Sequence, residues 1–165
     1  MTTSAPIPPI TGTVTVAVPI ETAFGVFTGS INSWWPHQFH IGHSDVDQVV
    51  LEPVEGGRWY ERGVDGVECD WGRVLVWEPP HRVLFTWQIN GSFVFDPDPA
   101  KASEIDVQFR ADGAGGSTVE VEHRLFERLD GGQAVRDTIN GGGGWVLLLD
   151  GLVNAAKADQ NAGPQ

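Results

Sequence analysis

The stretch that most constrains the fold is Trp71 to Trp87, which reads WGRVLVWEPPHRVLFTW. It consists of two apolar runs rich in β-branched and aromatic residues, joined by the short connection Glu78-Pro79-Pro80-His81. Proline cannot donate a hydrogen bond to a strand ladder and favours turns, so the two prolines mark the point where the chain reverses. The stretch therefore predicts an antiparallel hairpin at the middle of a curved sheet.

Five further strands are predicted around this hairpin, three from period-two alternation of apolar and polar residues and two, at residues 46–53 and 58–62, from the turns that bound them. They cover residues 12–18, 46–53, 58–62, 103–110 and 118–125. The last two strands alternate apolar residues with polar ones, many of them acidic, which is typical of an antiparallel sheet with one face in water. Turn residues separate the strands, most clearly in the glycine-rich stretch 112–116.

Two short helices are predicted directly after the first strand. Pro19 suits the first turn of a helix, and apolar residues at helical spacing follow it as far as Phe27. A second helical turn over residues 31–35 ends before Pro36, which cannot continue a helix. The order strand, helix, helix and then six strands is thus predicted from local patterns alone.

A long C-terminal helix is predicted from Val135 to Ala156, where apolar residues again recur at helical spacing. Four consecutive glycines, Gly141–Gly144, lie inside it, and each interior glycine costs about 1 kcal/mol relative to alanine. Two interpretations follow. Either the helix breaks and restarts near Trp145, or it continues because glycine lets it approach the sheet or a ligand closely.

Composition excludes several classes of partner. The 165 residues include 22 acidic and 10 basic residues, a formal net charge of -12, which would repel nucleic acid and anionic lipid. Cys69 is the single cysteine, so an intramolecular disulfide is excluded. The first eleven residues have no targeting pattern, and no apolar run is long enough to span a bilayer. We expect a cytoplasmic protein that binds neither nucleic acid nor membrane.

Several motifs resemble one known family. The hairpin is similar to the pattern GxVLxxxPPxRLxFxW, with Val83 where the pattern has leucine, and three further motifs occur in the expected order: Glu55-Gly56-Gly57-Arg58, His123 with Phe126, and Gly144-Trp145 with Leu148-Leu149. Together they are similar to the proteins related to the activator of Hsp90 ATPase, within the Bet v 1/START-like (SRPBCC) superfamily. The resemblance covers roughly residues 12 to 158.

This resemblance and the predicted elements imply an α+β helix-grip fold, β-α-α-β6-α, in which a curved antiparallel sheet wraps around a long C-terminal helix. Because a single cylindrical helix cannot fill the concave side of a curved sheet, an internal cavity is expected between the C-terminal helix and the sheet. The resemblance also favours a helix that continues through the glycines. We expect one domain at residues 12–158, with flexible tails at residues 1–11 and 159–165.

Strand parity selects candidate catalytic residues. If Val119 and Val121 point inward, so does His123, and if Trp59 points inward, so does Glu61. A histidine can transfer protons near neutral pH, and a carboxylate could orient it or act as a second acid or base. The alternative is structural: His123 would be a hydrogen-bonded core histidine, and Glu61 would pair with an arginine, namely Arg58, Arg62 or Arg73.

Ligand contacts are predicted mainly from the aromatic residues, which are abundant for a chain of this size. The candidates are Trp34, Trp35, His40, Trp59, Trp71, Phe85, Trp87, Phe93, Trp145 and Leu148. Aromatic side chains with a few polar groups are the usual lining of a small-molecule site, although ordinary core packing is the alternative for each tryptophan. The long connection 90–102 carries its own apolar residues and is a candidate lid.

The loop with His37, His40, His43 and Asp45 suggests a metal site by composition, but its spacing matches no known metal motif. The alternatives are rim histidines that contact a ligand, or ordinary loop residues. We therefore predict no metal and no cofactor.

The leading functional hypothesis is a cytoplasmic binding protein for a small hydrophobic or amphipathic molecule, held between the sheet and the C-terminal helix. The first alternative is an enzyme similar to polyketide cyclases and aromatases of the superfamily, using His123 and Glu61 for proton transfer. The second alternative, implied by the family name, is an Hsp90-type cochaperone. It is disfavoured because the eukaryotic activators carry a separate N-terminal domain that is not found in these 165 residues. An exposed sheet edge could also support a homodimer.

Overall fold

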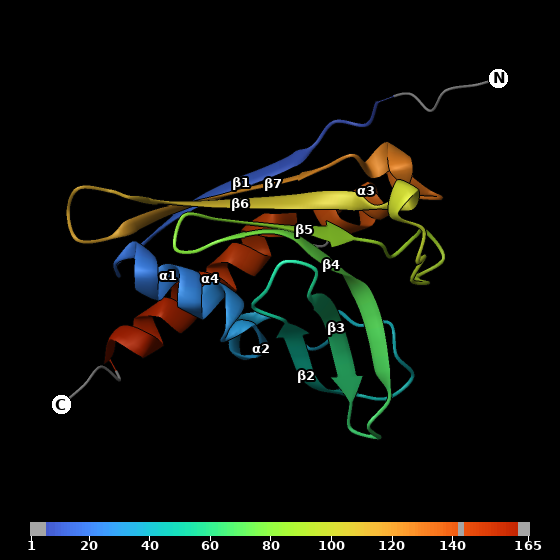
Figure 1. Ribbon diagram of the computed structural model, residues 1–165, viewed down its shortest axis with the longest axis horizontal. Helices are drawn as coiled ribbons and strands as arrows, with labels where there is room; N and C mark the ends of the chain where they lie inside the picture. The colour runs from blue at the N-terminus through green and yellow to red at the C-terminus, as the bar shows by residue number, and fades with distance from the viewer. Residues whose placement is uncertain (1–5, 142–143, 162–165) are drawn as a thin grey trace.

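A computed structural model describes residues 6–141 and 144–161 of the chain. Seven antiparallel strands form one sheet in the order β1-β7-β6-β5-β4-β3-β2. Their bounds are β1 Ile10–Val16, β2 Val46–Leu51, β3 Arg58–Gly63, β4 Glu68–Glu78, β5 Arg82–Trp87, β6 Ser103–Ala111 and β7 Ser117–Arg124. The sheet curves strongly from the long strands β1, β7 and β6 towards the short strands β2 and β3 (Figure 1).

The described helices are α1 Ile20–Thr28, α2 Ile31–Trp34, α3 Gly132–Gly141 and α4 Gly144–Asn161, with single turns η1 Pro99–Lys101 and η2 Phe126–Arg128. Helices α1 and α4 lie inside the bend of the sheet (Figure 1). This arrangement confirms the predicted α+β helix-grip architecture and its β-α-α-β6 beginning. None of the helices in the described residues has both the length and the apolar character needed to cross a membrane.

Some boundaries differ from those predicted. Strand β1 begins at Ile10, two residues earlier than expected, so Ile10 and Thr11 belong to the sheet and not to the tail. Helix α4 runs to Asn161, beyond the predicted limit at residue 158. The sequence left open whether the glycine block Gly141–Gly144 breaks the C-terminal helix. The answer depends on residues 142–143, which lie outside the described residues.

Strand β4 carries the bend of the sheet. Its first half pairs with β3 and its second half with β5, and the ladder has a register shift on each side. Such bulges bend a strand and increase its twist. Gly72 lies at this bend, where a Cβ atom would overlap the carbonyl oxygen of Thr86. The central hairpin predicted from the sequence is thus also the place where the sheet turns to enclose the helices.

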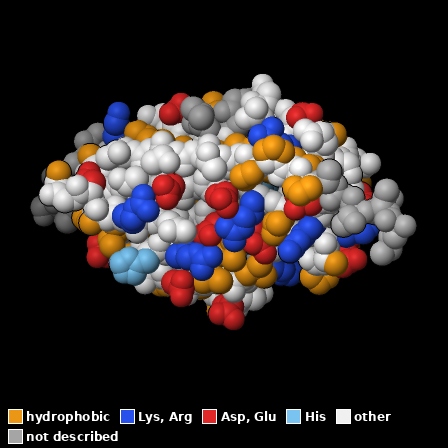
Figure 2. Space-filling view, turned by 90° about the horizontal axis from the view of Figure 1, so that it is seen from above, with side chains coloured by type: hydrophobic (Ala, Val, Ile, Leu, Met, Phe, Trp, Pro, Cys, Tyr) orange, Lys and Arg blue, Asp and Glu red, His pale blue; other side chains and the backbone are white. Residues whose placement is uncertain are grey.

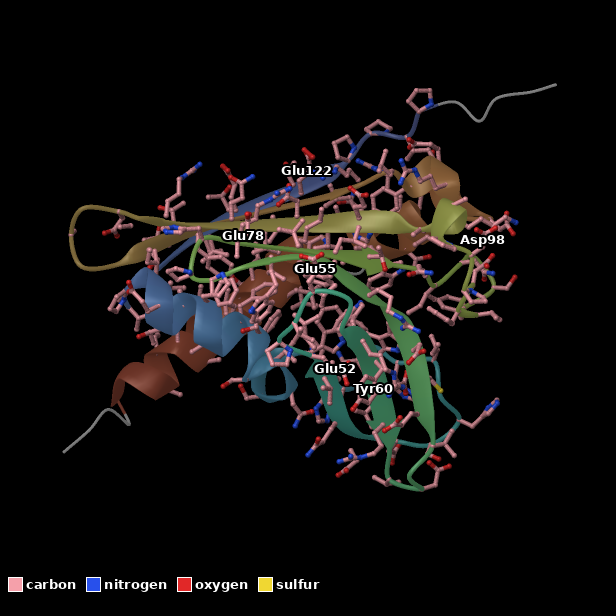
Figure 3. All side chains as sticks on the ribbon, viewed as in Figure 1. Glu52, Glu55, Tyr60, Glu78, Asp98 and Glu122 are labelled. Atoms are coloured by element: carbon pink, nitrogen blue, oxygen red, sulfur yellow. The ribbon has the colours of Figure 1, made fainter. Side chains whose placement is uncertain are left out.

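The two faces of the sheet follow the predicted alternation. On β7, Val119, Val121 and His123 are buried on the inner face. Glu122, between them, projects from the opposite side of the sheet (Figure 3). On that outer face Arg82 and Arg124 both pair with Asp106. Figure 2 shows basic and acidic side chains interspersed along this face.

Asp106 shows how the outer face tolerates a carboxylate that is only 6% exposed. Its burial would raise the pKa of Asp106, but hydrogen bonds from Arg82 and Arg124 outweigh burial and hold that pKa below its ordinary value. The inner face, in contrast, is almost entirely apolar and packs on α4. There, Leu148, Leu149 and Leu152 are buried.

Candidate functional site: an apolar cavity lined by tryptophan

A cavity of about 210 Å³ opens between the sheet, the loop after α2, and helices α3 and α4. Seven of the ten predicted ligand-binding residues line it: Trp35, His40, Trp71, Trp87, Phe93, Trp145 and Leu148. Six lining residues were missed: Gln38, Phe39, Ile41, Ile89, Thr138 and Ile139. The wall is thus built from segments far apart in the sequence.

The other three predicted ligand-binding residues do not line the cavity. Trp34, Trp59 and Phe85 belong to the hydrophobic core, and Trp59 and Phe85 have no exposed surface. The Trp34 indole donates to the carbonyl oxygens of Val26 and Phe27, which anchors it to α1. Trp59 packs edge-on against Trp71, with ring centroids 4.6 Å apart, so it supports the cavity wall from behind.

Each of the four tryptophans that line the cavity donates its indole N–H to an acceptor of the protein. The indole N–H of Trp35 donates to the Phe39 carbonyl oxygen at 3.3 Å, and that of Trp87 donates to the Ile89 carbonyl oxygen at 3.2 Å. Trp71 donates to Glu61 at 2.9 Å and Trp145 to His123 at 3.2 Å. With their polar atoms already satisfied, these rings present mainly carbon to the cavity.

His123 lies behind this wall and not in it. Its ring is fully buried, and its Nδ1 accepts the hydrogen bond from Trp145. Because Nδ1 accepts, the proton of the neutral ring is on Nε2, which lies 3.0 Å from the Ser103 hydroxyl. That hydroxyl in turn donates to the backbone carbonyl of Trp87. One imidazole therefore links two of the wall tryptophans.

The electrostatics of His123 match this structural arrangement. Burial lowers the pKa of His123 from 6.5 to about 3, so the ring is neutral near neutral pH. The predicted inward orientation of His123 is correct, but the residue does not reach the cavity. Its geometry corresponds to the alternative interpretation, a hydrogen-bonded core histidine.

Glu61 is buried beneath the loop that follows α2. Its carboxylate accepts hydrogen bonds from the backbone N–H groups of Ile41 at 2.6 Å and Gly42 at 3.2 Å, besides the indole of Trp71. Glu61 is 1% exposed and His40 Nδ1 lies 3.7 Å from its Oε2. The structure therefore places Glu61 with His40 and not with His123.

The alternative that Glu61 pairs with an arginine is wrong. Arg58 and Arg73 both pair with Asp70, and Arg62 pairs with Asp47. Strand parity placed Glu61 on the inner face, but its partners come from a loop about twenty residues earlier. Period-two parity assigns a face of the strand to Glu61 but does not indicate which loop covers that face.

The three loop histidines have separate surroundings. His37 Nε2 interacts with Asn32, His40 Nδ1 with the Gly42 carbonyl oxygen, and His43 is exposed. Over the described residues, no group of three or more histidine, cysteine, aspartate or glutamate side chains is arranged to hold a metal ion. Of these histidines, His40 is the one that lines the cavity.

The connection between β5 and β6 forms part of the cavity mouth. Phe93 lines the cavity although its side chain is 63% exposed, and its backbone has a φ of 60°. A bulky residue in this left-handed region is uncommon and is held by its surroundings. Here the side-chain oxygen of Asn90 accepts hydrogen bonds from the backbone N–H groups of Ser92 and Val94, the residues on either side of Phe93. Phe93 therefore borders the cavity, and the lid role of residues 90–102 stays a prediction.

Comparison with solved structures supports the fold and identifies relatives. An anthrahydroquino-gamma-pyrone synthase, Txn09, is 38% identical, with 91% of this chain and 97% of that chain covered and a TM-score of 0.64. A self-sacrificing resistance protein, CalC from Micromonospora echinospora, is 30% identical, with 93% and 96% covered and a TM-score of 0.67. Protein NE0264 from Nitrosomonas europaea, 13% identical with 93% and 97% covered and a TM-score of 0.64, shares the fold.

No curated protein matches the chain significantly. A family model described as "Activator of Hsp90 ATPase homolog 1-like protein" matches residues 17–157, which is most of the sequence. The match includes the central hairpin, the buried histidine and most of α4. The chain therefore belongs to the Activator of Hsp90 ATPase homolog 1-like family.

Proposed function

We propose that this protein binds a small, flat and largely apolar molecule in the tryptophan-lined cavity. The observation that carries the proposal is the cavity wall itself, in which Trp35, Trp71, Trp87 and Trp145 each donate the indole N–H to an acceptor of the protein. Binding is favoured when apolar ligand surface is buried against aromatic carbon, and such a wall offers few groups for hydrogen bonds to a ligand. It suits a ring system better than a sugar or a peptide.

The size of the cavity limits the ligand. Its volume of about 210 Å³ is below the roughly 300–1,000 Å³ of typical drug-sized pockets, and above the roughly 150 Å³ of an apolar cavity known to hold benzene. One or two fused rings fit inside it, and the remainder of a larger ligand would lie at the mouth, beside Phe93.

The relatives support an aromatic ligand. The 38% identical protein is named as the synthase of an anthrahydroquino-gamma-pyrone, a fused aromatic product. By this likeness the ligand of the present chain would be an oxygenated aromatic compound of the polyketide type. The same name supports a second candidate function, in which the bound molecule is also cyclised.

Naphthalene binding tests the proposal. Equilibrium dialysis is expected to show naphthalene bound to the wild-type protein at one site. Thr138→Trp places a large side chain at an exposed position of α3 that lines the cavity, and it should weaken binding at least tenfold. Gln133→Trp adds the same bulk at an exposed position of α3 outside the lining residues and should leave binding unchanged. Failure of naphthalene to bind, or equal binding by both variants, would reject the cavity as the site.

A further inference from the structure

His40 differs from the other polar side chains that line the cavity. Gln38 and Thr138 are exposed, so water can satisfy either of them, whereas the His40 side chain is 24% exposed. Its Nδ1 lies 3.0 Å from the Gly42 carbonyl oxygen. A carbonyl oxygen can only accept, so this contact requires the proton of the neutral ring to be on Nδ1. The lone pair is then on Nε2.

Glu61 stabilises this arrangement from below. Its carboxylate holds the backbone of Ile41 and Gly42, the two residues that follow His40, and Oε2 also lies 3.7 Å from His40 Nδ1. A carboxylate beside one ring nitrogen fixes both the orientation and the tautomer of a histidine. Because Nδ1 faces the loop and Glu61, Nε2 is the ring nitrogen left to face the cavity. Within the described residues, Nε2 of His40 has no hydrogen-bond partner.

We propose that His40 Nε2 is the hydrogen-bond acceptor that recognises a hydroxyl group on the ligand, with Glu61 as its positioning residue. The ligand class is then a hydroxylated aromatic compound, such as a phenol or a naphthol, whose carbon rings lie on the tryptophans. This inference rests on the proposed function, because it names the polar contact made within the same cavity. It also assigns opposite roles to two histidines: His123 buries both nitrogens behind the wall, and His40 offers one to the ligand.

Paired ligands test the assignment. In equilibrium dialysis at neutral pH, the wild-type protein should bind 1-naphthol about threefold to tenfold more tightly than naphthalene, as expected for one net hydrogen bond. His40→Phe keeps a planar ring but removes the acceptor, so the preference for 1-naphthol over naphthalene should disappear. His43→Phe, at the exposed histidine of the same loop, should retain the preference.

The outcomes separate this inference from the proposed function. If naphthalene binds but the wild-type protein shows no preference, or if His40→Phe keeps the preference, the assignment to His40 is overturned and the binding function stands. If neither compound binds, the binding function fails and the inference fails with it.

The tautomers provide a test that needs no ligand. Long-range ¹H–¹⁵N spectra of the wild-type protein should show the proton of neutral His40 on Nδ1 and that of His123 on Nε2. The opposite tautomer at His40 would overturn the inference. Glu61→Gln should reduce the fraction of His40 that is protonated on Nδ1. A general loss of stability would lower the amount of folded protein but would not change the tautomer of His40 in the protein that remains folded. An unchanged fraction would show that Glu61 does not position the ring.

Discussion

At the scale of single residues, the most informative side chain is a histidine that does not reach the cavity. The ring of His123 packs against Phe126, with ring centroids 4.3 Å apart and the planes tilted by 36°, and its Nδ1 accepts a hydrogen bond from the indole N–H of Trp145. Through Ser103 it is also linked to the backbone of Trp87. Since both tryptophans line the cavity, His123 fixes the wall without contacting a ligand.

His123 is predicted to make stability depend on pH. Its pKa of about 3 in the folded protein lies below the value of 6.5 for an unfolded histidine, so the unfolded chain binds more protons between these values. The free energy of unfolding should therefore be fully maintained above pH 6.5 and fall as the pH decreases towards 3. Between pH 7 and pH 5 this residue alone should account for a loss of about 2 kcal/mol.

Urea unfolding followed by tryptophan fluorescence can isolate this contribution. His123→Asn keeps a polar group near Nδ1 and cannot titrate, so its stability should fall less between pH 7 and pH 5 than that of the wild-type protein. This window lies above the range in which Asp106 titrates, because the pKa of Asp106 is lowered by Arg82 and Arg124. Parallel pH profiles for the two proteins would contradict a neutral, buried His123.

At the scale of elements, α4 approaches its neighbours through glycine. A Cβ atom at Gly151 of α4 would lie 2.7 Å from the carbonyl oxygen of Trp34 at the end of α2, and one at Gly12 of β1 would lie 2.9 Å from Leu149. These close approaches place Trp145 and Leu148, on the same helix, against the cavity. The distance between α4 and its neighbours is thus set by two residues without side chains.

Two glycine-to-alanine variants should have opposite effects. Gly151→Ala forces α4 away from α2 and is expected to destabilise the protein by about 1–3 kcal/mol, despite the better helix propensity of alanine. Gly25→Ala, in α1, meets no atom within 4 Å and should stabilise by about 0.5–1 kcal/mol. Thermal unfolding measures both changes. Equal stabilisation by the two substitutions would show that α2 and α4 are not closely packed.

At the scale of the whole molecule, the net charge of -12 favours a neutral ligand. An anionic ligand approaches against the summed negative potential, which salt screens because the Debye length falls from about 30 Å at 0.01 M to about 8 Å at 0.15 M. Between these salt concentrations, the affinity for 1-naphthoate should increase severalfold, while that for 1-naphthol should change little. An affinity for 1-naphthoate that decreases with salt would instead indicate a local positive site at the cavity.

The fold was largely predictable because its determinants are local. The proline-linked hairpin, the alternation on β6 and β7, and the helical spacing after Pro19 each specify an element from neighbouring residues. Parity likewise predicted that Val121 and His123 share the buried face. Which buried residues border a cavity was not predictable in this way, because Trp59 and Trp71 are both buried on the same part of the sheet and only Trp71 reaches the cavity.

The amino-acid sequence by itself determined the order of the elements, the inner and outer faces of the strands, the family and the aromatic character of the interior. These depend on the periodicity and chemistry of residues close together in the chain. Only the tertiary structure decided that Glu61 holds the loop of His40, that His123 stays behind the wall, and that Thr138 and Ile139 of α3 complete the cavity. Such contacts join segments 20 or more residues apart, and their geometry depends on how the bent sheet and α4 pack together.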